Sequence, residues 1–83
     1  MAVTAWVLIQ TEIGKARAVA DAIVAIRYPG LRVLAADTVT GPHDVISHVE
    51  ATDLETFNTG VEATVDAIPG VEHRVTCVAF HAQ

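Results

Sequence analysis

The sequence has one cysteine, few basic residues and no long apolar run, and each scarcity excludes a class of protein. Cys77 has no partner for an internal disulfide or a cysteine zinc site, which favours a reducing compartment. Five basic residues against ten acidic ones give a net charge of −5, which argues against direct nucleic-acid binding. No apolar run approaches the roughly 18 residues of a membrane span. Residues 1–9 lack the basic start of a secretory signal. We therefore expect a cytoplasmic protein that binds neither nucleic acid nor membranes.

Apolar residues make up 52% of the 83 positions and charged residues 18%, which excludes a disordered chain. A chain of this length forms one domain, over residues 1–83, and buries only a modest fraction of its surface. Without a disulfide or a metal, such a domain needs unusually good packing or a partner. The composition therefore predicts a single domain that is supported by a partner.

Changes in apolar periodicity mark the first half of the chain. Residues 3–10 are rich in β-branched and aromatic side chains and predict a buried strand. From Ile13 to Ile26 apolar residues recur every three or four positions, which predicts a helix of about 14 residues with Thr11 as its N-cap. The Pro-Gly pair that follows ends this helix, and a second strand is predicted over 31–40.

The second half repeats this order after about 40 residues. A strand is predicted over 43–50, and Thr52 and Glu55 form a capping box that opens a second helix. A last strand is predicted over 71–80. Two halves of this kind predict the ferredoxin-like βαββαβ fold of the α+β class. Its four-stranded antiparallel sheet has both helices on one face and the first and third strands in the middle. Gly60, inside the second helix, indicates close approach by a neighbouring element.

The strands carry apolar residues on both faces of this sheet, although two helices cover only one. In the first strand, for example, Val7 and Ile9 alternate with Trp6 and Leu8. Cys77 is expected on the covered face as a buried, inert thiol. The second face is expected to be mixed and to contain Trp6, Leu8, Ile46, Val78 and Phe80 beside His48, Arg74 and Thr76. Because an apolar patch of this size marks an interface, we expect two copies to pack sheet against sheet.

Residues 40–46, Thr-Gly-Pro-His-Asp-Val-Ile, resemble the Thr-Gly-x-Tyr-Asp turn and strand of the effector domain of Lrp/AsnC transcription regulators. The acidic helix entry at 51–54, the Pro-Gly-Val exit at 68–72 and the Thr-Cys-Val of the last strand are also similar to that family. The resemblance therefore covers essentially the whole chain. Two features depart from the family: His43 stands where an aromatic residue is often found, and 83 residues leave no room for its N-terminal helix-turn-helix.

The resemblance implies a stand-alone effector-binding domain, of the RAM type, that does not itself contact DNA. Domains of this family form dimeric α/β barrels by pairing sheet to sheet, and their dimers gather into rings. Amino acids or related small molecules bind between dimers, near the turn between the second and third strands. The resemblance thus implies a homo-oligomer with a small-molecule effector, and it allows co-assembly with a full-length regulator of the family.

Gly41 and Asp44 are suited to an amino-acid site. A turn glycine lets backbone N–H groups approach a ligand carboxylate, and a carboxylate three residues further on accepts hydrogen bonds from an ammonium group. The alternative is that Gly41 only makes the turn and Asp44 only solvates a strand end. The full candidate set for effector binding is Thr40, Gly41, Pro42, His43, Asp44 and Thr76.

Other chemistry has less support in the sequence. The four histidines have no spacing typical of a metal site, and His48 with Glu50 is the one local pair on a strand face. No Ser/His/Asp or paired-carboxylate spacing suggests hydrolysis, and no glycine-rich phosphate loop follows a strand. A cofactor-free monooxygenase on the same barrel, with Trp6, His48 and Asn58 around an internal cavity, is the alternative, because a fold alone does not decide function. We predict a sensing module that is not an enzyme and needs no metal or cofactor.

Overall fold

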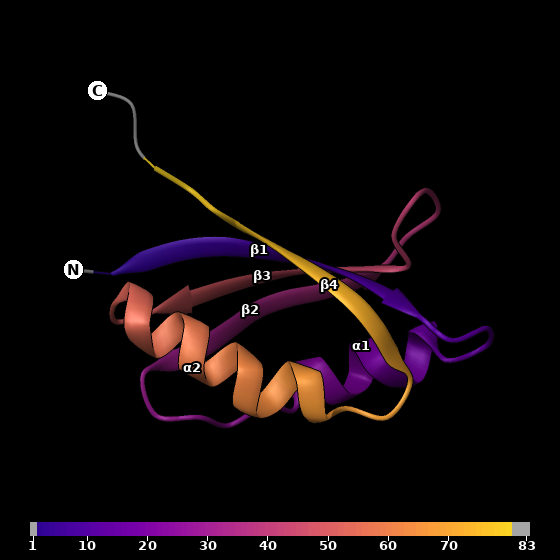
Figure 1. The fold of residues 1–83 in the computed structure, drawn as a ribbon, viewed down its shortest axis with the longest axis horizontal. Helices are drawn as coiled ribbons and strands as arrows, with labels where there is room; N and C mark the ends of the chain where they lie inside the picture. Colours follow the sequence, from indigo (N-terminus) through magenta and orange to yellow (C-terminus); the bar gives the residue numbers. More distant parts are fainter. Residues whose placement is uncertain (1, 81–83) are drawn as a thin grey trace.

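The computed structural model describes residues 2–80, which form strands and helices in the order β-α-β-β-α-β (Figure 1). The strands are β1 (Val3–Thr11), β2 (Leu31–Thr38), β3 (Val45–Ala51) and β4 (Val71–Val78). The helices are α1 (Ala16–Val24) and α2 (Leu54–Thr64), and a short 3₁₀ helix, η1 (Val65–Ala67), extends α2. Within residues 2–80, no helix has the length and apolar character needed to cross a membrane.

The sheet has the strand order β2-β3-β1-β4, and all neighbours are antiparallel. The central strand β1 sets the register, with Ala5 opposite Val49 of β3 and Val78 of β4. Both helices lie against the same face of the sheet (Figure 1). The predicted ferredoxin-like fold, with the first and third strands in the middle, is therefore confirmed.

The core lies between the sheet and the two helices. Alternate residues of β1 and β3 point into it, and Ser47 there donates its hydroxyl proton to the carbonyl of Val7 at 3.3 Å. On the other side, the apolar residues that recur every three or four positions in α1 and α2 pack against the sheet. The largest fully buried side chains are Phe57, Ile9, Ile23, Val7, Val19, Val45, Val49, Val61 and Val65.

The first helix begins later than predicted, and Thr11 is not its N-cap. Thr11 belongs to β1, and the N–H of Glu12 donates to the carbonyl of Gly70 at 2.8 Å, so the chain stays paired with the start of β4. Gly14 then makes the turn with a φ of 81°, and Ile13 is fully exposed. Because this pairing is tertiary, the apolar periodicity could not reveal where the helix starts.

The second helix is capped by Asp53, and the predicted capping box of Thr52 with Glu55 is wrong. The Asp53 carboxylate accepts the backbone N–H of Thr56 at 2.7 Å, and this hydrogen bond lowers the pKa of Asp53. The N–H of Thr52 instead donates to the carbonyl of Gly30 at 3.0 Å, which continues the pairing of β3 with β2. The helix therefore begins one residue later than the box implies.

Gly60 lies where α2 meets the start of β2, as predicted. A Cβ atom at Gly60 would lie 3.1 Å from Leu31 Cδ2 and 3.1 Å from Tyr28 Cδ2. Since real Cβ atoms rarely approach other heavy atoms so closely, a side chain here would push the helix away from the sheet. The absence of a side chain is what allows this contact.

The prediction of which β4 residues face the helices is wrong, and so is the predicted burial of Cys77. Cys77 pairs with Trp6 on the face away from the helices and is exposed, whereas Thr76 and Val78 face the helix layer. Arg74 also lies on the helix side, where it donates to Asp66 of η1 at 2.6 Å. Both sets of alternate residues in β4 include apolar side chains, so the sequence alone could not show which set faces the helices.

The face without helices is called the open face below. Cross-strand partners share a face, so the register assigns its members. They are Thr4, Trp6, Leu8 and Gln10 of β1, Arg32, Ala35 and Asp37 of β2, Ile46, His48 and Glu50 of β3, and His73, Val75 and Cys77 of β4. The predicted mixed, partly apolar face therefore exists, although β4 contributes other residues to it than expected. Phe80, predicted to join it, lies beyond the end of β4 and is largely exposed.

Candidate functional site

The turn between β2 and β3 is fastened at both of its ends. The N–H of Val39 donates to the carbonyl of Asp44 at 2.9 Å, which closes the turn on itself. The N–H of Asp44 donates to the carbonyl of Ile9 at 2.8 Å, and Gln10 Nε2 donates to the carbonyl of Pro42 at 3.0 Å. The turn is thus anchored to the neighbouring strand β1 and has a defined place at the end of the sheet.

Among residues 2–80, only one of the two oxygens of the Asp44 carboxylate accepts hydrogen bonds. Oδ2 accepts the backbone N–H of Thr11 at 2.8 Å and the Thr11 hydroxyl at 3.4 Å. Oδ1 has no hydrogen bond to any residue in the 2–80 range. Asp44 therefore holds the turn against β1 and still offers a negatively charged oxygen for a ligand.

The backbone at the tip of the turn is open. Gly41 has a φ of 137°, and a Cβ atom there would meet nothing within 4 Å. In the described part of the chain, the N–H groups of Gly41 and His43 have no protein acceptor. Pro42 has no N–H, so these two amides are the donors on either side of it in the turn. Donors and a carboxylate in one turn complement a ligand that carries both charges.

The structure brings five of the six candidate site residues together. Thr40, Gly41 and Pro42 are exposed in the turn, and His43 and Asp44 follow as half-buried residues. Thr76 lies elsewhere: it pairs with Val7 in the middle of β4 and faces the helix layer, and β1 separates β4 from the strand that follows the turn. Within one chain, Thr76 is therefore not part of the turn site.

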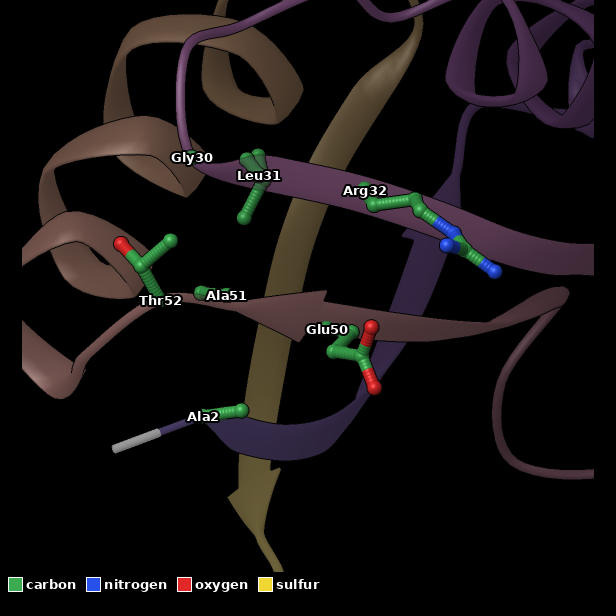
Figure 2. Close-up of a pocket in the computed structure, with 7 residues that line it drawn as sticks. All are labelled: Ala2, Gly30, Leu31, Arg32, Glu50, Ala51 and Thr52. Carbon is green, nitrogen blue, oxygen red and sulfur yellow. The ribbon is translucent and has the colours of Figure 1, made fainter.

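A second feature, which the sequence reasoning missed, is an open pocket of about 300 Å³ at the opposite end of β3 (Figure 2). Arg32 and Glu50 are cross-strand partners at its edge, and they extend from neighbouring strands on the same side of it. Its lining residues are Ala2, Gly30, Leu31, Arg32, Glu50, Ala51 and Thr52. The sequence signal was a pair of opposite charges, Arg32 and Glu50, near the ends of two otherwise mainly apolar strands, but their juxtaposition depends on the register.

The third feature is a stack of two rings on the open face. The Trp6 and His48 rings are parallel, with centroids 4.5 Å apart and an interplanar angle of 2°. The Nε2 atom of His48 is buried and has no hydrogen-bond partner among the residues described. The shared face of His48 and Glu50, expected from their spacing, is also observed.

The residues of the alternative enzymatic interpretation do not meet within one chain. Trp6 and His48 are on the open face, whereas Asn58 is an exposed residue of α2, on the helical side of the sheet. Across residues 2–80, histidine, cysteine and acidic side chains form no group of three or more that could hold a metal ion. The most complete constellation for ligand chemistry is the turn from Thr40 to Asp44.

The family model of the Lrp/AsnC ligand binding domain matches residues 4–82. The solved structure of a protein from Thermus thermophilus has 32% identity and a TM-score of 0.84, covering 98% of this chain and 96% of that one. A hypothetical protein from Pyrococcus horikoshii has 29% identity and a TM-score of 0.82, covering 96% of this chain and 92% of that one.

A transcriptional regulator from Neisseria meningitidis, solved as a complex with L-methionine, shares the fold at 21% identity and a TM-score of 0.75. The match covers 95% of this chain and 50% of the regulator, so the chain corresponds to half of that protein. Among curated proteins there is no match. The family match extends over nearly all of the chain and agrees with the turn motif and the observed topology, and the chain belongs to the Lrp/AsnC ligand-binding domain family.

Proposed function

We propose that this domain senses an amino acid and assembles with further copies of itself, without contacting DNA and without catalysing a reaction. Membership of a ligand-binding family supports the sensing role. The L-methionine complex of the Neisseria regulator is a precedent for an amino-acid ligand on this fold. In this proposal the effector lies at the turn from Thr40 to Asp44, between neighbouring dimers.

The observation that carries the proposal is that, within residues 2–80, one carboxylate oxygen and two backbone amides of the same turn have no hydrogen-bond partner. Asp44 Oδ1 accepts from the ligand ammonium, while the N–H groups of Gly41 and His43 face the ligand carboxylate. The contacts of the turn with β1 fix these groups before the ligand arrives, which lowers the entropy lost on binding. In this proposal, residues of the neighbouring dimer contact the side chain of the bound amino acid and decide which amino acid is selected.

The assembly role is supported by the open face. Interface centres are poor in charge and rich in aromatic residues. On the two central strands of this face, the single charged residue is Glu50. Trp6 is 38% exposed there, between His48 of β3 and Cys77 of β4. A stable interface buries roughly 800 Å² on each partner, and an uncovered face of four strands is the natural surface for it. A second copy of the chain is the proposed occupant.

Calorimetric titration with each of the common amino acids tests the sensing role. Asp44→Asn keeps an oxygen for Thr11 and removes the charge, so affinity for the selected amino acid should fall about tenfold to a hundredfold. Asp21→Asn, at an exposed position of α1, removes the same charge elsewhere and should leave affinity unchanged. A panel without any binder, or equal affinities for wild type and Asp44→Asn, would overturn the proposed site.

A further inference from the structure

The imidazole of His48 lies near the middle of the open face with one nitrogen unsatisfied. Its ring is stacked on Trp6, and Ala35 of β2 stands opposite on the other side. Within the described chain, Nε2 is the one buried side-chain nitrogen or oxygen that lacks a hydrogen-bond partner. Such atoms are rare, because a buried polar group without a partner loses the hydrogen bonds that water would make.

No charged group in the described chain pairs with this imidazole. On its own strand the nearest is Glu50, two residues further along, and Glu50 stands opposite Arg32 of β2. Asp37, also on β2, stands opposite Ile46 on the other side of His48. On β4 the titratable residue across Trp6 is Cys77. Neither a hydrogen bond nor an ion pair joins any of them to His48.

We propose that His48 makes the self-association of this domain dependent on pH, so that acidification separates subunits packed through their open faces. This inference rests on the self-association put forward above. A neutral imidazole stacked on Trp6 is compatible with a covered position near the centre of this mixed face. A charged imidazolium in the same place must be desolvated without a carboxylate to pair with it, which is costly.

The direction follows from proton linkage. An imidazole in water gains its proton near pH 6.5, and burial disfavours the charged form. In a single chain Nε2 is buried but the His48 side chain is still half-exposed, and a second copy would remove that remaining contact with water. Separated subunits therefore bind more protons than assembled ones in mildly acidic solution, and a fall in pH favours separation. A dimer covers two imidazoles, so its dissociation constant should rise by up to about a hundredfold for each pH unit below roughly 6.5.

The proposal is tested by sedimentation equilibrium at about pH 8 and about pH 5.5, which lie on either side of the ordinary pKa of an imidazole. Circular dichroism verifies folding at each pH. The wild type should be assembled at the higher pH and dissociate more at the lower. His48→Phe preserves an aromatic ring on Trp6 and should remain assembled at both. His48→Gln, which is polar but does not titrate, is the second variant and should also lose the pH dependence. His43→Gln and His73→Gln should retain it.

The outcomes separate this proposal from the proposed function. A wild type that is monomeric at both pH values would overturn the self-association itself. A wild type that remains assembled to the same extent at both would overturn the role of His48 and leave the assembly intact. Variants at position 48 that dissociate in acid as the wild type does would also overturn it.

Discussion

Substitution of Asp44 distinguishes the two roles that the structure gives its carboxylate. Oδ2 accepts the N–H of Thr11 at 2.8 Å, and Thr11 is only 8% exposed. Asp44→Ala removes the acceptor and leaves this N–H poorly solvated and unpaired. Asp44→Asn places a neutral amide oxygen in the same position. The first variant therefore tests the anchor of the turn, and the second isolates the charge.

The magnitudes follow from the type of hydrogen bond. A bond to a charged group contributes about 1.5–3 kcal/mol, and one between neutral groups about 0.5–1.5 kcal/mol. Asp44→Ala should lower the free energy of unfolding by about 1.5–3 kcal/mol, and Asp44→Asn by roughly half as much. With a urea m-value of about 1 kcal/mol/M for a chain of this size, the midpoint for Asp44→Ala falls by about 1.5–3 M.

Urea unfolding followed by circular dichroism measures these shifts. All variants must be compared at one protein concentration, because self-association adds to apparent stability. A midpoint for Asp44→Ala equal to that of the wild type would show that the bond to Thr11 does not hold the turn. A midpoint for Asp44→Asn as low as that for Asp44→Ala would refute the claim that acceptor position, rather than charge, gives part of the stability.

The other predictions concern α2. Asp53→Ala should lower the urea midpoint because it removes the N-cap, whereas Thr52→Ala should leave it nearly unchanged. The hydrogen bond from Thr56 holds the pKa of Asp53 below its usual range, so its stabilisation is present above about pH 3.9 and is lost as the pH falls further. The midpoint difference between wild type and Asp53→Ala should therefore shrink in acid. Gly60→Ala should cost up to about 2 kcal/mol in urea unfolding, because crowding of Leu31 and Tyr28 by the new Cβ, about 1–3 kcal/mol, outweighs a gain of about 1 kcal/mol in helix propensity.

The fold could be predicted because its signals are local. The period of the apolar residues changes from strand to helix and back twice, and a Pro-Gly pair follows each helix. What failed depended on tertiary pairing. The bond between Glu12 and Gly70 delays the start of α1, and the bond between Thr52 and Gly30 keeps Thr52 in the strand pairing, so that Asp53 caps α2. The spacing of the apolar residues indicates neither of these backbone hydrogen bonds.

The candidate site was predictable where its residues are consecutive. Gly41 and Asp44 lie in one turn, so turn chemistry pointed to both of them. The bond from Asp44 to Thr11 joins residues 33 positions apart and follows only from the strand register. The register of β4 against β1 places Thr76 on the helix side and Cys77 on the open face. Because both faces of β4 carry apolar residues, the sequence could not show which face is covered.

Native mass spectrometry of the chain, mixed with the amino acids selected by titration, tests the central claim most directly, because it reports assembly and binding together. We expect masses that are multiples of the 8.8 kDa chain, with the amino acid retained on the assembled species. Asp44→Asn should assemble as the wild type does but lose the bound amino acid. A single species at 8.8 kDa that carries no amino acid would contradict both the assembly and the sensing role.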